Sequence, residues 1–215
     1  MYRIAFLASS VLLYTMLISC SPQEKPKALP YYNTPDFTPQ FMASADEAAQ
    51  KINHVISPFA LTNQHGQAIT EQTVAGRVHV ANFIFTSCGS ICPVMTQHMK
   101  LVQEKYGNNP DVVILSYSVT PWIDTVSRLN DYAEANGINS PNWHLLTGSR
   151  SEIYTLARTS YFAEEDLGFT KDSTEFLHTE HVLLIDQSRR IRGIYNGTLQ
   201  LEMEQMIEDI AVLLE

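Results

Sequence analysis

Two cysteines, Cys88 and Cys92, stand where two predicted elements meet, with three residues between them. The β-branched and aromatic run at 78–85 predicts a buried strand, and the apolar spacing of 93–106 predicts an amphipathic helix. Functional sites of α/β proteins gather at the carboxyl ends of such strands. The free backbone N–H groups at the start of a helix stabilise a thiolate and lower the pKa of a thiol placed there. We therefore expect a reactive thiol pair at this junction.

The spacing of the pair is compatible with several kinds of chemistry. Redox pairs of the thioredoxin type have two residues between the cysteines, so a gap of three widens the pair and leaves room for an ion between the sulfurs. Two thiolates are soft donors that favour Cu(I) over hard cations, although zinc also accepts them. Because two cysteines alone under-fill a metal site, a metal interpretation needs a third ligand downstream. A thiol–disulfide couple and a plain structural disulfide are the alternatives.

The elements around the pair predict an α/β domain with a thioredoxin-like fold. A hairpin across 63–66 precedes the first buried strand as an N-terminal extension. Strands and helices then alternate in the order βαβα, and the chain closes with a second hairpin and a helix on which Leu201 and Met206 are expected to point inward. The elements expected after the first helix are a strand at 111–119, a helix at 124–136, a strand at 143–146, a helix at 149–159, a hairpin of 182–186 and 191–195, and a helix at 200–214.

The N-terminus predicts export and attachment of a lipid. Its apolar run starts at Ile4 after the single charge of Arg3 and lasts about 15 residues, shorter than the ~20 of a membrane-spanning helix. Residues 1–19 therefore read as a lipoprotein signal peptide, and the ending Leu17-Ile18-Ser19-Cys20 resembles a bacterial lipobox whose cysteine is acylated. An uncleaved helical anchor is the alternative. Both interpretations place the remaining chain at a membrane, on the periplasmic or extracytoplasmic side of a bacterial cell envelope.

Residues 20–50 are predicted to be a lipid-anchored linker, and residues 51–215 the folded domain. Five of the ten prolines fall within this linker at intervals of four or five residues, which favours an extended, solvated conformation. Four aromatic residues are candidates for docking part of it onto the domain: Tyr31, Tyr32, Phe37 and Phe41.

Composition and charge narrow the range of partners. The chain has 215 residues, which suits one domain and a tail. Its 14 basic against 23 acidic residues give a net charge of −9, and such a surface repels phosphate backbones, so we expect no nucleic-acid partner. Three cysteines do not make a disulfide framework.

Two motifs resemble a known family. The run F-x-F-T-x-C-x-x-x-C-P at 83–93 and the run H-T-x-x-x-L-L-I-D at 178–186 are similar to those of the Sco/SenC family of thioredoxin-fold copper proteins. The resemblance implies that Cys88, Cys92 and His178 bind copper. It further implies that the protein assists assembly of the dinuclear copper centre of a respiratory cytochrome oxidase, or reduces its thiols.

Two residues depart from the family pattern. Gly89 stands where a proline is usual after the first cysteine, and Thr120 stands where an acidic residue commonly precedes the proline after the second strand. Neither departure removes a metal donor, so the expectation of copper binding remains.

The seven histidines compete for the third ligand position. His178 lies seven residues before Ile185, in the family register. His181 follows three residues later and, on an extended chain, points to the opposite face. His98 lies six residues beyond Cys92 on the predicted helix and faces away from it. A surface or core role is expected for each of the remaining four, His54, His65, His79 and His144.

Four other groups with donor atoms are expected to be structural. Met95 and Met99 follow Cys92 at helical spacing, which is more typical of core packing than of copper ligation. Asp124 and Asp186 have no second carboxylate or nucleophile beside them in the sequence, so we expect capping or surface roles.

Three functions remain open, in order of preference. The first is a copper metallochaperone that is tethered to the membrane and delivers copper to an oxidase subunit. The second is a thiol–disulfide oxidoreductase that uses Cys88 and Cys92 as a redox pair and has no need of His178. The third, peroxide reduction, lacks a dedicated motif.

Overall fold

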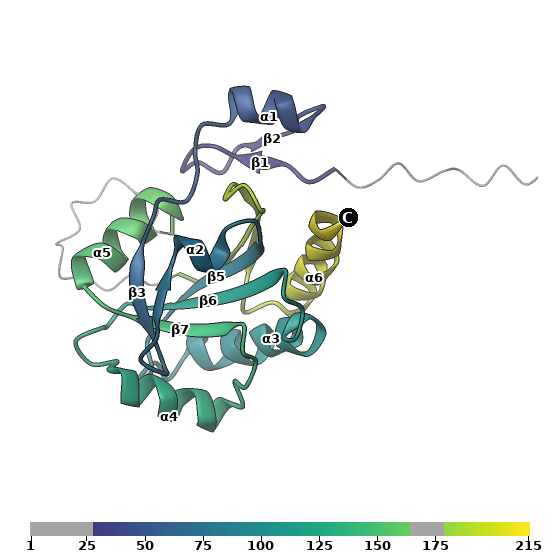
Figure 1. The fold of residues 1–215 in the computed structure, drawn as a ribbon. Coiled ribbons are helices and arrows are strands. Elements are labelled where there is room, and N and C mark those ends of the chain that lie inside the picture. The colour runs from purple at the N-terminus through teal and green to yellow at the C-terminus, as the bar shows by residue number, and fades with distance from the viewer. Residues whose placement is uncertain (1–27, 164–178) are drawn as a thin grey trace, which may run out of the picture.

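The computed structural model describes residues 28–163 and 179–215. The described residues form one nine-stranded mixed sheet with helices on both faces (Figure 1). In sheet order the strands are β2 (Pro39–Gln40), β1 (Tyr31–Tyr32), β9 (Ile191–Asn196), β8 (His181–Ile185), β5 (Val78–Ile84), β6 (Val112–Ser118), β7 (Trp143–Thr147), β3 (Ala60–Asn63) and β4 (Ala68–Thr70).

The two central strands carry the core. All seven residues of β5 and all seven of β6 are buried, because helices cover both faces of this part of the sheet. The two strands pair in parallel from Val78↔Val112 to Ile84↔Ser118, so both end at the same edge. This shared edge is where the loop with the cysteines begins.

The sheet separates the core into two layers, and each layer is covered by its own helices. One layer packs against α3 (Ile91–Tyr106), α4 (Val126–Asn136) and α6 (Gln200–Leu214), and the other against α2 (Glu71–Val74), α5 (Arg150–Thr155) and the π-helical turn Leu156–Ser160. Successive residues of a strand alternate between the layers, as in β8, where Val182 faces α3 and Leu183 faces the layer of α5.

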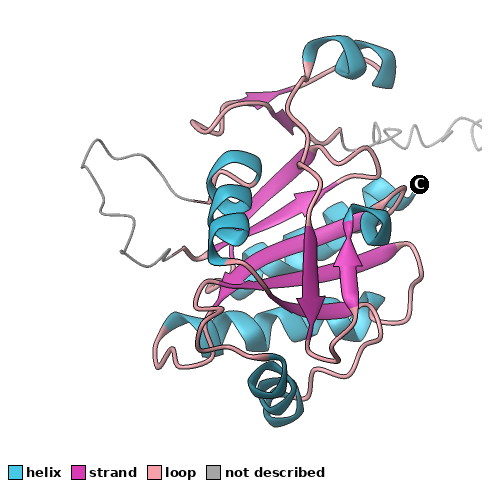
Figure 2. Ribbon diagram, turned by 60° about the vertical axis from the view of Figure 1, so that its left-hand side comes forward, coloured by secondary structure: helices cyan, strands magenta, loops and turns pink. Residues whose placement is uncertain are grey.

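The N-terminal segment is folded onto the domain, so the expectation of an extended linker does not describe residues 28–50. Tyr32 pairs with Ile191 of β9, and α1 (Ala45–Lys51) follows the β1–β2 hairpin at one end of the molecule (Figure 2). Tyr32 and Phe37 pack on the core layer of α5, as expected, whereas Phe41 is 65% exposed. Prolines suit this short edge hairpin because an edge strand leaves N–H groups unpaired.

The predicted α/β topology with its N-terminal hairpin is confirmed, with shifts of a few residues at element ends. The expectation that Leu201 points inward is wrong, because its side chain is 80% exposed. The buried stripe of α6 runs through Met203, Met206 and Ile210, and Leu201 lies about 200° round the helix from Met203.

Candidate functional site

The two cysteines lie at the edge where β5 ends and α3 begins. After Ile84 the chain turns through a short loop, in which the Cys88 amide donates to the Phe85 carbonyl at 3.1 Å. Cys92 is in the first turn of α3, which has Ser90 as its N-cap without a capping side-chain hydrogen bond. Both thiols are free, with Cys88 half-buried and Cys92 buried. The helix start therefore offers its N–H groups to a thiol, as the sequence predicted.

The environment of Cys88 favours its thiolate. Burial on its own raises the pKa of this thiol, but hydrogen bonds from the backbone of Cys92, Ser90 and Ile91 and from the Cys92 thiol outweigh it and lower the pKa below 9.0. The Cys88 sulfur thus accepts the N–H groups that a capping side chain would otherwise take.

Cys92 has the opposite electrostatic character. Burial, together with a smaller contribution from the neighbouring Cys88, raises the pKa of its thiol to about 12 despite a lowering hydrogen bond from the Phe85 backbone. The pair therefore combines one reachable thiol of lowered pKa with one buried thiol that stays protonated at neutral pH.

A phenol from α4 lies within electrostatic range of both thiols. Burial raises the pKa of Tyr132, and negative charge on Cys92, Cys88 and Asp124 adds to the increase against a lowering hydrogen bond from Thr96. The Tyr132 hydroxyl bonds the Thr96 hydroxyl at 2.8 Å, one turn after Cys92. No sequence pattern marks Tyr132 as part of the site, because it is far from the cysteine motif along the chain.

Asp124 has neither the capping nor the surface role that was expected, since Thr125 caps α4. Its side chain is fully buried beside the cysteine loop, where it accepts hydrogen bonds from the Thr86 hydroxyl at 2.6 Å and the Ser118 hydroxyl at 2.6 Å. Asp186 is also buried but does cap a turn, accepting the amides of Ser188 and Arg190 in the β8–β9 connection.

The third predicted ligand, His178, lies outside the described residues. His181 opens β8 and packs edge-on against Phe37, with 5.8 Å between ring centroids, in the core layer opposite α3. His98 also turns away from the cysteines, as predicted, and its Nδ1 pairs with the Gly197 carbonyl at 2.8 Å.

Three of the other histidines and the two methionines hold structural positions, whereas His65 is exposed. The His54 ring stacks on Phe162 at 4.1 Å, His79 is fully buried, and His144 contacts the Asn63 amide at 3.3 Å. Met95 and Met99 are both fully buried in the layer of α3, which agrees with the expected core packing.

Residues 28–163 and 179–215 contain neither a three-ligand metal cluster nor a helix able to span a membrane. No three His, Cys, Asp or Glu side chains in these ranges come together as a metal site, so the described donors at the loop are Cys88 and Cys92 alone. None of the helices in these ranges has the length and apolarity to cross a bilayer. The predicted signal peptide 1–19 and the lipidation site Cys20 lie outside the described residues.

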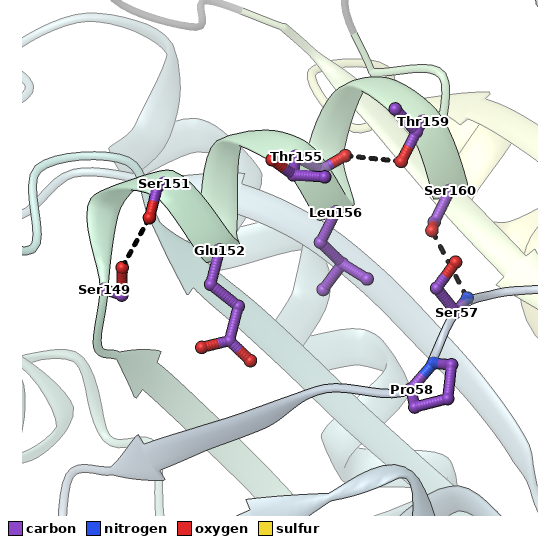
Figure 3. A pocket seen from close by; sticks show the side chains of 9 residues that line it. All are labelled: Ser57, Pro58, Ser149, Ser151, Glu152, Thr155, Leu156, Thr159 and Ser160. Carbon is purple, nitrogen blue, oxygen red and sulfur yellow. Dashed lines mark hydrogen bonds between the residues drawn. The ribbon is translucent and has the colours of Figure 1, made fainter.

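A cavity of about 410 Å³ lies elsewhere, between α5 and the chain entering β3 (Figure 3). Neither cysteine lines it, and six of its nine lining residues are serine or threonine, four of which use their hydroxyl groups in hydrogen bonds to one another or to the backbone. Ser149 pairs with Ser151 at 2.8 Å, and Thr159 donates to the Thr155 carbonyl at 2.8 Å. This cavity offers none of the soft donors that the cysteine loop provides.

Several known proteins resemble this chain in sequence and in fold. A family model for SCO1/SenC proteins matches residues 47–215. The SCO1 protein homolog of Bacillus subtilis is 34% identical over 161 residues, covering 74% of this chain and 82% of the homolog. A SCO1/SenC family lipoprotein from Bacillus anthracis has a TM-score of 0.67 at 30% identity, covering 76% of this chain and 97% of that one.

A second solved structure links the fold to thiol chemistry in a relative. BsSco, a member of the Sco family of cytochrome c oxidase assembly proteins in which a disulfide switch was identified, has a TM-score of 0.63 at 32% identity and covers 75% of this chain and 94% of its own. The family model spans most of the chain and includes both core layers and the cysteine loop. This chain therefore belongs to the SCO1/SenC family.

Proposed function

We propose that this chain binds copper through Cys88, Cys92 and His178 and helps to mature the copper centre of a respiratory cytochrome oxidase. The observation that carries this proposal is the pair of free thiols at the start of α3, one of them reachable and of lowered pKa. Membership of a family that includes cytochrome c oxidase assembly proteins supports the role in assembly.

The donor set suits copper as a cargo. Two cysteine sulfurs and one neutral imidazole are soft to intermediate donors, which favour Cu(I) over hard cations. Cys88 is the sulfur that a partner reaches first, because Cys92 is only 4% exposed. Replacement of one thiolate at a time by thiolates of the partner would then transfer the ion without releasing it into solution.

The proposed partner is a copper-accepting oxidase subunit or its thiols, met outside the cytoplasm at a membrane. We place the tether at Cys20 as a lipid attached after removal of residues 1–19. The Bacillus anthracis relative is a lipoprotein, which supports this assignment.

A second candidate function is thiol–disulfide exchange, and the opposed pKa shifts of the two thiols favour it. The Cys88 thiolate would attack a partner disulfide, forming a mixed disulfide and releasing one partner thiolate. Cys92, after losing its proton, would then attack the Cys88 sulfur and release the second thiolate, so the partner gains the two electrons that the pair loses. Both functions fit one protein, because the thiolates bind copper only in the reduced pair.

The two functions separate in a Cu(I) titration of the reduced full-length chain in detergent, against a competing chelator. Cys20→Ala in every sample leaves Cys88 and Cys92 as the only cysteines. We expect one copper per chain, an affinity about a hundredfold or more lower in Cys88→Ser, and about tenfold or more lower in His178→Ala.

The matched control is His181→Ala, which removes a histidine only three residues from His178 and packed against Phe37. It should leave the copper affinity within about twofold of the parent, since its side chain lies in the opposite core layer. Binding that is weak, or equally strong in the parent and in His178→Ala, would contradict the three-ligand site and favour thiol–disulfide exchange.

A further inference from the structure

A buried carboxylate organises the loop that leads into Cys88. Asp124 is fully buried and accepts three hydroxyl groups, from Thr86 at 2.6 Å, from Ser118 at 2.6 Å and from Thr120 at 2.9 Å. It also accepts the backbone amide of Thr86 at 3.3 Å. These donors come from the loop after β5, from the end of β6 and from the turn that follows β6. One side chain therefore joins the ends of both central strands.

Arg128 extends this connection to the residue next to Cys88. Its Nε lies 3.6 Å from Asp124 and donates to the Thr86 hydroxyl at 2.6 Å, while its second guanidinium nitrogen donates to the Ser87 hydroxyl at 2.7 Å. A planar guanidinium presents these donors in a fixed geometry. Thr86 and Ser87, the two residues directly before Cys88, are thereby held by side chains from the turn before α4 and from α4 itself.

The backbone on the other side of the loop is also fixed. The Val119 amide donates to the Ile84 carbonyl at 2.9 Å, which continues the β5–β6 pairing to the point where the loop begins. The first turn of α3 holds Cys92, whose neighbours Met95 and Met99 are fully buried. The span between these two anchors includes Gly89, around which a Cβ would meet no atom within 4 Å, so neighbouring atoms do not restrain it. The hydrogen bonds to Thr86 and Ser87 therefore restrain the two residues directly before Cys88.

We propose that Asp124, acting through Thr86 and Arg128, is a positioning residue that sets the placement of Cys88 relative to Cys92. Its role toward copper rests on the proposed function, whereas its effect on the thiol pair does not. Asp124 touches neither sulfur in this arrangement. It acts by limiting the conformations of the loop that carries Cys88, so that fewer are lost when the pair closes on an ion or forms a disulfide.

Thr120 takes a defined part in this arrangement. Its hydroxyl donates to Asp124 and its amide donates to the Ser118 hydroxyl oxygen at 3.1 Å, so the turn between β6 and α4 is closed around the carboxylate. The threonine that departs from the family pattern thus serves Asp124, and removing its hydroxyl alone should loosen the loop less than removing the carboxylate.

Asp186 provides a matched control for Asp124. It is also a buried aspartate, 5% exposed, and accepts the Ser188 hydroxyl at 2.6 Å and the Arg190 amide at 3.0 Å, with Arg192 at 3.1 Å. It lies in the β8–β9 turn and shares no partner with the cysteine loop. Asp124→Asn and Asp186→Asn therefore make the same chemical change in two similarly buried networks, and only the first adjoins the cysteines.

The test measures two properties of the thiol pair in the full-length chain carrying Cys20→Ala. One is the equilibrium constant between the Cys88–Cys92 dithiol and glutathione disulfide, in the absence of copper. The other is the Cu(I) affinity against a competing chelator. In Asp124→Asn we expect the equilibrium constant to change about tenfold, or about 30 mV, and the copper affinity to fall about tenfold or more. In Asp186→Asn we expect the equilibrium constant and the copper affinity to stay within about twofold of the parent, although the thermal unfolding midpoint of this variant falls.

Thr120→Val and Thr120→Ser keep the proposal testable if Asp124→Asn does not fold. The valine should shift the glutathione equilibrium two- to threefold, and the serine, which keeps the hydroxyl, should restore it. Equal shifts in the two asparagine variants, or no shift in Asp124→Asn or Thr120→Val, would overturn the positioning role. Absence of copper binding in the parent, together with a selective shift of the glutathione equilibrium in Asp124→Asn, would sustain the positioning role and reject the proposed copper function.

Discussion

Two clusters of polar side chains lie in different parts of this molecule, and only one of them contains charged groups. The first, which we call the loop cluster, holds the cysteine loop and consists of Thr86, Ser118, Thr120, Asp124 and Arg128. The second, which we call the core cluster, lies inside the layer of α5 and consists of His79, Tyr117 and Tyr161.

The loop cluster contains a carboxylate and a guanidinium and reaches solvent through Arg128, whose side chain is 46% exposed. The core cluster is sealed. Its three residues are fully buried, the two phenols bond each other at 2.9 Å, and His79 meets Tyr161 at 3.3 Å. Burial raises the pKa of both phenols and lowers that of His79 to about 3, so all three stay neutral near pH 7. Charged side chains therefore occur in the loop cluster beside the thiols, whereas the core cluster inside the layer of α5 holds only neutral groups.

The largest expected effect is acid destabilisation through the core cluster. Burial, with a smaller contribution from Arg189, lowers the pKa of His79 from 6.5 to about 3. Between these pH values the unfolded chain binds a proton that the folded chain does not. The free energy of unfolding should therefore fall with decreasing pH, by up to about 1.4 kcal/mol per pH unit from this residue. Chemical denaturation at a series of pH values from 7 to 4 measures this slope.

The control is His79→Leu, which removes the titrating ring while Tyr161 keeps its bond to Tyr117. Other groups titrate in both chains, among them His144, whose pKa burial lowers to about 4, so the difference in slope isolates His79. Identical slopes in the two chains would contradict the assignment. A change of copper affinity in His79→Leu at pH 7 would break the proposed separation between the two clusters.

Most of the fold follows from the sequence because its signals are local and strong. The apolar runs that form β5 and β6 are short and rich in β-branched and aromatic residues, which favours strands over buried helices. The helical spacing of α3 and α4 is regular. The N-terminal segment was less predictable, because its docking depends on Arg192, which is more than 150 residues away along the chain.

The site follows from the sequence only in part. The spacing of Cys88 and Cys92 is visible in the sequence. The roles of Asp124 and Tyr132, in contrast, arise from packing between β6, α4 and the loop. The sequence signal available for Asp124 was its place four residues after Thr120, in the turn following a buried strand, but this pattern also occurs at exposed helix starts.

The next largest effect concerns the two thiols of the cysteine loop. With a pKa of about 12, Cys92 is about one part in ten thousand thiolate at pH 8, whereas the lowered pKa of Cys88 leaves a much larger fraction of this thiol ionised. The lower-pKa thiolate is the weaker nucleophile, but this offsets only part of the difference in thiolate fraction. We therefore expect Cys88 to react with iodoacetamide at least about thirtyfold faster than Cys92. Peptide mass spectrometry after a short exposure gives the ratio, and equal labelling would contradict the opposed pKa shifts.

A smaller effect is expected far from both clusters, at Arg192. Its guanidinium donates to the carbonyls of Leu29 at 2.8 Å and Pro30 at 2.9 Å and lies 3.8 Å from the Tyr31 ring centroid. Arg192→Lys keeps the charge but not the fork of donors, and should cost about 1–2 kcal/mol of unfolding free energy. Amide hydrogen exchange at Tyr31 and Tyr32 should accelerate, while copper affinity stays unchanged. Unchanged exchange there would show that β1 is held by other contacts.

The smallest effect is expected at Leu201, on the outer side of α6. Since this side chain is 80% exposed, Leu201→Gln removes little buried apolar surface and should change the unfolding free energy by less than about 0.5 kcal/mol. Met203→Ala, two residues later on the fully buried stripe, should cost about 2–5 kcal/mol. Denaturant titration of the two variants compares them directly. A cost at Leu201 close to that at Met203 would mean that α6 is rotated from its described position, or that Leu201 is covered by another molecule in solution.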